Sequence, residues 1–151
     1  MTLFCYPTDI METKGKVMAI DLGEKRIGLA ICDETRTIAA GYDVLPRKSR
    51  EEDFERYAKI IEDEAITLVV MGLPITLNGG EGQRAAWVRD YAAELSEAII
   101  VPVVFWDERF STKQAEASLH ARGKRGKQVR DRLDAVAAAF FLQEYLDTHV
   151  D

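Results

Sequence analysis

The chain has 151 residues, 47% of them hydrophobic, and a formal net charge of −6. This length suits one domain with a sizeable core, and the acidic balance argues against binding nucleic acid through bulk charge. The apolar runs are shorter than the ~20 residues of a membrane-spanning helix, and the two cysteines form no C-x-x-C pair. We therefore expect a single cytoplasmic domain without disulfide bonds or contact with a membrane.

The first part of the chain predicts a leader followed by three strands. Residues 1–15 show no sustained periodicity, so we expect them to form a flexible leader before a domain of residues 16–151. Short turns separate the three extended segments that follow, which predicts an antiparallel meander. These segments are Val17 to Asp21, Ile27 to Asp33, and Thr37 to Leu45.

Beyond the meander, helical periods alternate with apolar runs. The first helical period buries Phe54, Tyr57, Ala58, Ile61 and Ala65 on one face. The whole pattern predicts an α/β fold in which a mixed central sheet, the three-strand antiparallel meander plus parallel strands, is flanked by helices. The later elements are a strand Leu68–Met71, a helix Arg84–Leu95, a strand Ile99–Trp106, a helix Ser111–Ala121, a basic loop Gly123–Gln128 and a final helix Leu133–Leu146.

Four acids stand where these elements end or begin. Asp21 ends the first strand, Asp107 and Glu108 follow the last strand, and Asp134 opens the final helix. If the first and last strands are neighbours, their carboxylates meet at one rim of the sheet. Carboxylates brought together without His or Cys suit a hard cation such as Mg²⁺ or Mn²⁺, and such a site supports phosphoryl chemistry.

A basic segment accompanies the last of these acids. Residues 122–132 contain six Lys or Arg residues and one Asp, which suits a contact with a phosphate backbone. Each feature alone also has a structural explanation, since Asp21 could form a turn and Asp134 could cap a helix. Glu108 could pair with Arg109 on the surface, and the basic loop could simply be solvated. Only the conjunction of these features favours a site.

Four sequence blocks resemble the YqgF/RuvX-like family of ribonuclease H-like nucleases, associated with pre-16S rRNA maturation and with Holliday junction resolution. They extend over nearly the whole chain after the leader, and Thr76 departs from the Asn that is common in the family after G-L-P. The blocks are AIDLGEKRIGLAICD from Ala19, VVMGLP from Val69 with the following NGGEGQRA, FWDERFSTKQAE from Phe105, and DRLDAVAAAFFLQEYLD from Asp131.

The resemblance implies a ribonuclease H-like fold and assigns roles to residues. The family's catalytic, metal-binding acids match Asp21, Glu108 and Asp134, with Asp107 as a further candidate ligand for Mg²⁺ or Mn²⁺. The family's basic residues near these acids are candidates for contact with nucleic acid, and the basic segment adds four more. The complete set is Lys25, Arg26, Arg109, Lys124, Arg125, Lys127 and Arg130.

The resulting hypothesis is a metal-dependent hydrolase that cleaves phosphodiester bonds and processes the 5′ end of pre-16S rRNA. Its partners would be structured RNA, as naked precursor or in ribosome assembly intermediates, and the protein could be a monomer or a homodimer. One alternative is a Holliday junction resolvase, which acts on branched DNA and needs a dimer. A second is a nucleic-acid-binding regulator without catalysis, and a third, an actin-like ATPase, needs a longer chain.

Overall fold

A computed structural model describes residues 15–74, 80–107 and 127–149, the last with side chains from residue 135 onward. Within these ranges the chain forms a five-stranded sheet in the order β3-β2-β1-β4-β5. β1 pairs antiparallel with β2, as does β2 with β3, whereas β1 with β4 and β4 with β5 are parallel pairs. The predicted mixed sheet is thereby confirmed. Its strands are β1 Lys16–Leu22, β2 Arg26–Cys32, β3 Ala39–Pro46, β4 Ile66–Leu73 and β5 Val103–Asp107.

The helices follow the sequence less closely than the strands do. α1 (Arg50–Glu64) and α2 (Gln83–Ala98) occupy the predicted segments, but α4 spans Lys127–Thr148 and begins six residues before the predicted start. The last two residues of the predicted basic loop are therefore helical. β5 is also shorter than predicted. The leader up to residue 14 and the helix expected over Ser111–Ala121 lie outside the described residues. None of the described helices is long and apolar enough to cross a membrane.

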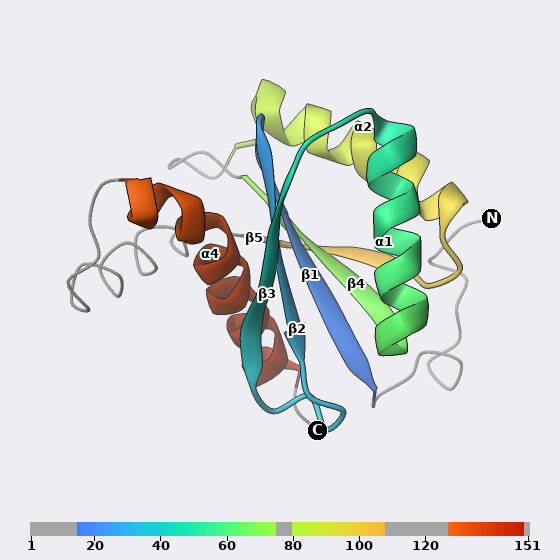
Figure 1. The fold of residues 1–151 in the computed structure, drawn as a ribbon, viewed down its shortest axis with the longest axis vertical. Helices are drawn as coiled ribbons and strands as arrows, with labels where there is room; N and C mark the ends of the chain where they lie inside the picture. Colours follow the sequence, from blue (N-terminus) through green and yellow to red (C-terminus); the bar gives the residue numbers. More distant parts are fainter. Residues whose placement is uncertain (1–14, 75–79, 108–126, 150–151) are drawn as a thin grey trace.

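Helices lie on both faces of the sheet (Figure 1), and its central strands are buried, whereas the edge strand β3 is largely exposed. α1 and α2 cover one face, and α4 crosses the other. Side chains alternate along a strand, so Met18 and Ile20 of β1 face α1 and α2, whereas Val17 and Ala19 face α4. A strand covered on both sides should be almost continuously apolar, and β1 is buried throughout except at Lys16 and Asp21.

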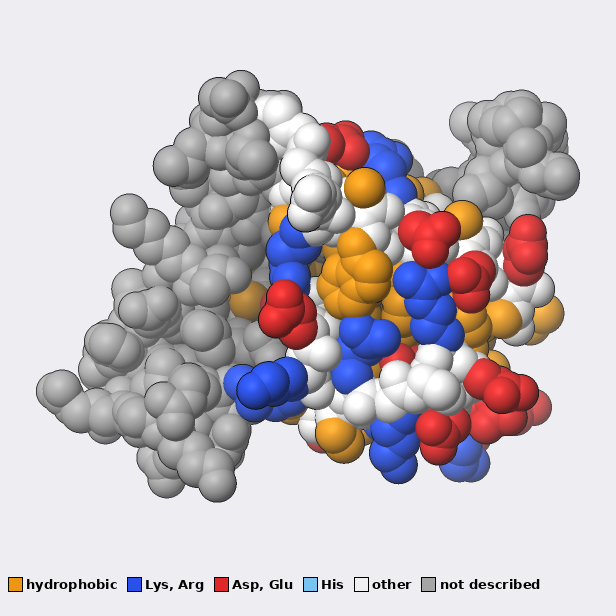
Figure 2. All heavy atoms as spheres, turned by 90° about the horizontal axis from the view of Figure 1, so that it is seen from above, with side chains coloured by type: hydrophobic (Ala, Val, Ile, Leu, Met, Phe, Trp, Pro, Cys, Tyr) orange, Lys and Arg blue, Asp and Glu red, His pale blue; other side chains and the backbone are white. Residues whose placement is uncertain are grey.

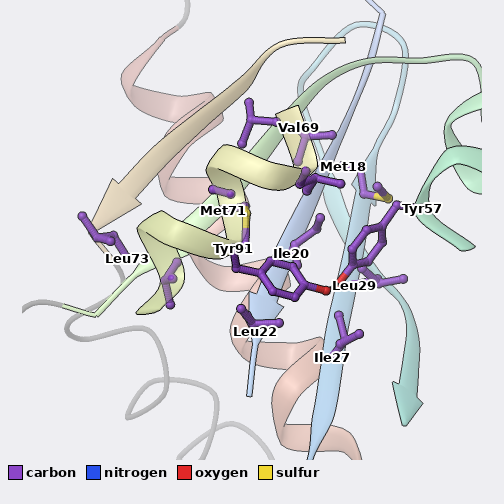
Figure 3. Close-up of a cluster of buried hydrophobic side chains, with 14 of the residues drawn as sticks. Met18, Ile20, Leu22, Ile27, Leu29, Tyr57, Val69, Met71, Leu73 and Tyr91 are labelled. Atoms are coloured by element: carbon purple, nitrogen blue, oxygen red, sulfur yellow. Dashed lines mark hydrogen bonds between the residues drawn. The ribbon is translucent and has the colours of Figure 1, made fainter. Parts of the chain in front are cut away.

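The core under α1 and α2 contains a polar network (Figure 3). Asp53 of α1 is fully buried, and its carboxylate accepts hydrogen bonds from the Tyr91 hydroxyl (3.0 Å) and the Lys48 backbone N–H (3.0 Å). The Tyr57 and Tyr91 hydroxyls are 3.0 Å apart, and since Tyr91 donates to Asp53, Tyr57 donates to Tyr91. Burial raises the pKa of Tyr91, which keeps this donor protonated. The network ties α1 to α2 and to the turn before α1.

Two guanidinium groups complete the environment of Asp53. Arg47 Nε lies 3.4 Å from Asp53 Oδ2, and Arg56 Nη2 donates to Oδ1. The predicted apolar face of α1 is only partly correct, because Ala58 and Ala65 are exposed while Asp53 is buried. A buried carboxylate needs such partners, since an unpaired charge in the core is strongly unfavourable.

The turn between β2 and β3 depends on another carboxylate. Asp33 accepts hydrogen bonds from the backbone N–H groups of Thr37 (2.8 Å) and Ile38 (2.9 Å) and from the Thr35 hydroxyl. Led by the bond from Ile38, these contacts lower the pKa of Asp33 to about 2. Arg36 within this turn has a φ of 59°, in the left-handed region, so the chain needs a local anchor there.

This depressed pKa predicts how acid acts on the turn. A group with a lowered folded pKa stabilises the fold above its unfolded value of about 4, and this contribution is lost as the pH falls toward about 2. We expect Asp33→Asn to have a lower Tm than the wild type at neutral pH. This difference in Tm should shrink as the pH falls toward the pKa of the Asp33 carboxyl group in the folded protein. A Tm difference that does not change with pH would contradict the assignment. Differential scanning fluorimetry along a pH series measures it.

Candidate active site at the end of β1

Asp21 lies where β1 reaches the rim of the sheet. It is half-buried, and its partner across the β1–β2 ladder is Gly28. On the other side, Ile20 pairs with Met71 of β4, which places Gly72 level with Asp21. Both strands beside Asp21 therefore present glycine at its level. Neither of these two positions therefore adds a side chain next to the carboxylate.

A tight turn takes the chain away from Asp21. Gly23 N–H donates to the carbonyl of Arg26 at 2.9 Å, and a Cβ on Gly23 would lie 2.7 Å from that same oxygen. Since real Cβ atoms do not approach an oxygen this closely, the turn requires glycine. Glycine at position 23 thus has a specific physical reason.

Asp21 faces the side of the sheet that α4 covers. Its side chain lies on the same face of β1 as those of Val17 and Ala19, which belong to the core under α4. α4 comes close to the same face of the sheet at β3, two strands from β1, since a Cβ on Gly41 would be 3.5 Å from the Cβ of Ala135. Small residues on the strands allow that approach. Ala135 directly follows Asp134 in the chain, so α4 carries Asp134 on a helix that packs on the same face as Asp21.

The structure corrects two expectations about the other acids. β4 lies between β1 and β5, so the strands that carry Asp21 and Asp107 are not neighbours and are separated by about 10 Å, two strand spacings. Asp107 is exposed and lies on the same face of β5 as Phe105, which packs on the core under α1 and α2, so it points away from the α4 face. Asp134 lies well inside α4 and does not open that helix.

The remaining predicted residues are only partly covered by the structure. Lys25 is exposed in the β1–β2 turn, and Arg26 begins β2 half-buried, on the same face as Gly28. No group of three His, Cys, Asp or Glu side chains forms a metal site among the residues whose side chains are described. α4 contains Lys127, Arg130 and Asp134, for which only the backbone is described. The other four residues lie outside the described residues: Glu108, Arg109, Lys124 and Arg125.

Three residues that the sequence did not single out approach this rim. Arg84 of α2 donates from Nη2 to the backbone carbonyl of Leu22, next to Asp21, at 3.1 Å. Its guanidinium carbon lies 5.6 Å from the ring centre of Trp87, and that of Arg47 lies 5.1 Å from the same ring. The sequence signal that could have indicated them is the spacing of Arg84 and Trp87, a cationic and an aromatic residue three positions apart at the start of α2.

Comparison with known sequences gives the same family over most of the chain. The family model RuvX, described as Holliday junction resolvase, matches residues 15–148. A Caldanaerobacter subterraneus protein named "Putative pre-16S rRNA nuclease" is 41% identical over 138 residues, which cover 88% of this chain and 96% of that protein. A Syntrophomonas wolfei protein of the same name is 38% identical over 132 residues, covering 87% and 94% of the two chains.

Solved structures share the fold at low sequence identity. Thermus thermophilus RuvC in complex with a Holliday junction substrate aligns with a TM-score of 0.55 at 17% identity, covering 88% of this chain and 94% of that one. The Fowlpox virus resolvase in complex with Holliday junction DNA aligns with a TM-score of 0.54 at 13% identity, covering 90% and 99%. These alignments show a RuvC-like, ribonuclease H-like α/β fold. With the family match over residues 15–148, the chain belongs to the RuvX family.

Proposed function

We propose that this protein is a divalent-metal-dependent nuclease that cleaves structured RNA in the 5′ region of pre-16S rRNA. The observation that carries the proposal is the place of Asp21, a carboxylate on a rigid strand end with glycine at its level on both neighbouring strands. The relatives named for pre-16S rRNA nuclease support the choice of substrate. A cytoplasmic location and ribosome assembly intermediates as partners belong to the same proposal.

Asp21, Glu108 and Asp134 would hold the metal. Their donor atoms are carboxylate oxygens, the ligands that Mg²⁺ and Mn²⁺ prefer. When bound, such an ion supplies an activated water and stabilises the charge that develops on the leaving oxygen. The proposal requires Glu108 to turn toward the α4 face, as Trp106 does two residues earlier. Asp107 faces the other way, so we propose no ligand role for it.

The basic residues would bind and orient the nucleic acid. Lys25 and Arg26 follow Asp21 directly and would contact the phosphates next to the cleaved bond. The basic residues between Glu108 and Asp134 in the chain would contact the strand on the other side of the site. They are Arg109, Lys124, Arg125, Lys127 and Arg130.

A cleavage assay on two substrates tests the proposal. Purified protein is incubated with a labelled 16S rRNA precursor fragment and with a synthetic four-way DNA junction, each with Mg²⁺, with Mn²⁺ and with a chelator. We expect cleavage of the RNA that stops when the metal is removed. RNA cleavage that persists in chelator would contradict the metal requirement, and the absence of cleavage with either metal would contradict the nuclease assignment.

A Holliday junction resolvase is the second candidate, supported by the RuvX family description and by the likeness to resolvase folds. Resolution cuts two strands symmetrically, so it needs two active sites related by a dyad. Junction cleavage by a dimer, without cleavage of the RNA, would favour this candidate. RNA binding without cleavage of either substrate would favour a regulator.

A further inference from the structure

The β1–β2 turn, the β3–α1 connection and the start of α2 meet on the α1 and α2 side of the rim, where two guanidinium groups lie over one indole ring. We define the cationic ledge as Lys25, Arg47, Lys48, Arg84 and Trp87. Figure 2 looks down on this end of the molecule and shows Lys and Arg side chains around an exposed hydrophobic patch. The ledge extends the site beyond the basic residues that the sequence indicated.

Hydrogen bonds to backbone carbonyls join these three segments into one surface. The Arg47 N–H donates to the carbonyl of Lys25 at 2.8 Å, which links the β3–α1 connection to the β1–β2 turn. Arg84 donates to the carbonyl of Leu22, which links α2 to the end of β1. The same strand end carries Asp21. Because Asp21 faces the α4 side, a strand of nucleic acid lying on the ledge would reach the candidate active site by crossing the rim at the end of β1.

Aromatic contacts and a buried acid hold the two guanidinium groups in place. Arg47 lies 5.1 Å from the ring centre of Trp87 and 5.4 Å from that of Tyr91, and it also pairs with the buried Asp53. Arg84 lies 5.6 Å from the ring centre of Trp87, yet 45% of its side chain is exposed. A guanidinium oriented in this way offers phosphate oxygens a fixed set of donors. Trp87 is thus a positioning residue.

Arg47 is paired with the buried Asp53, but the other three cations of the ledge have little balancing charge within the described part of the chain. The ammonium groups of Lys25 and Lys48 form no ion pair with any described residue, and both side chains are exposed. Glu24 lies 3.9 Å from Arg84 and is 82% exposed, so that pair is loose and solvated. Arg50, by contrast, is paired with Asp90 and Glu94, and these acids bound the ledge.

We propose that the cationic ledge binds the phosphate backbone of a single RNA strand and guides it to Asp21. The choice of RNA as the ligand rests on the proposed nuclease function, whereas binding to a phosphate backbone is inferred from the residues of the ledge. Arg84, Lys25 and Lys48 supply the phosphate donors. Trp87 and Arg47 keep the surface in shape, and Glu24 opposes binding by repelling the phosphates.

The test measures RNA binding without cleavage. Fluorescence anisotropy of a labelled single-stranded fragment of the 16S rRNA precursor is recorded in chelator at several salt concentrations. The triple variant Lys25→Gln, Lys48→Gln, Arg84→Gln should bind about tenfold or more weakly, with a salt slope smaller by about 2, since each phosphate contact to a single strand contributes about 0.7. Glu24→Gln should bind more tightly than the wild type.

Arg89→Ala is the matched control. Arg89 also belongs to α2 and its side chain is 48% exposed, close to the 45% of Arg84. Its guanidinium donates two hydrogen bonds to Glu81, at 2.7 and 2.8 Å, and lies 4.9 Å from the ring centre of Phe105. Its RNA affinity should stay within about twofold of the wild type, because a charge already paired adds little. Lys48→Gln alone, at an exposed side chain, keeps the test valid if the triple variant does not fold.

The outcomes test RNA binding by the ledge and the nuclease function separately. Equal RNA affinity and salt slope for the wild type and the triple variant would overturn the ledge, as would weaker binding of the four-way DNA junction alone. Ledge-dependent RNA binding by a protein that cleaves no RNA with metal would support the ledge and contradict the nuclease function. RNA cleavage with a ledge-independent affinity would do the reverse.

Discussion

Asp21→Asn is expected to lower the rate of metal-dependent RNA cleavage by at least about 100-fold, while RNA binding in chelator stays close to that of the wild type. Asn keeps the shape of the side chain and removes its charge. The two glycines level with Asp21 leave no other side chain from the neighbouring strands to take its place. Single-turnover cleavage of the 16S rRNA precursor fragment, at saturating protein, measures the chemical step without product release.

Asp63→Asn is the control for this prediction. Asp63 belongs to α1, is 54% exposed and pairs on the surface with Lys59, so its replacement should leave cleavage unchanged. Both variants should retain the far-UV circular dichroism of the wild type. A folded Asp21→Asn protein that cleaves at the wild-type rate would remove Asp21 from the chemistry.

Asp53→Ala is expected to lower the free energy of unfolding by about 3 kcal/mol. The substitution removes the partner of Arg47, Arg56 and Tyr91 at once and leaves the Lys48 N–H without its acceptor. Breaking a buried ion pair costs about 3–5 kcal/mol. The lower end applies because the Arg47 and Arg56 side chains are 17% and 26% exposed and can turn toward water.

Urea unfolding followed by circular dichroism measures this loss, with Asp63→Ala as the matched control in the same helix. The exposed pair of Asp63 and Lys59 should contribute less than about 1 kcal/mol. If Asp53→Ala and Asp63→Ala shift the unfolding midpoint equally, the buried network does not stabilise this fold. Because Asp53 also anchors Arg47, the Asp53 variant should in addition bind RNA more weakly in chelator.

The strands could be predicted from the sequence because burial on both faces leaves a continuous apolar signal. β1 and β4 read directly as such runs, and the antiparallel meander follows from the short turns between its strands. The position of β4 between β1 and β5 could not be read in the same way, because strand order depends on pairing between distant segments. For that reason Asp107 was expected nearer to Asp21 than the structure places it.

Helix boundaries and the polar core were harder to predict for local reasons. The first turns of α4 are rich in charged residues, so the apolar period used to locate a helix begins only near Leu133. Asp53 stands one turn before Tyr57 and two before Ile61, on the buried face of α1, but an acid there reads as polar unless its partners are known. Arg47 and Tyr91 are distant in the chain, and only the fold brings them together.

The parts of the candidate site that could be predicted are those where the local sequence around one residue indicates its role. The parts that depend on residues from other strands or helices could not be predicted. Asp21 at a strand end with a glycine turn could be recognised from sequence and resemblance. The glycines level with it, Gly28 and Gly72, come from two other strands and have meaning only once the register is known. Arg84 and Trp87 were likewise overlooked because their relation to β1 is purely spatial.

The central claim is that Asp21 helps to bind a divalent ion at the end of β1. Electron paramagnetic resonance of Mn²⁺ titrated into wild-type protein, Asp21→Asn and Asp63→Asn tests it without any nucleic acid. The claim predicts that Asp21→Asn binds Mn²⁺ at least about tenfold more weakly, while Asp63→Asn matches the wild type. Equal Mn²⁺ binding by all three proteins would contradict it.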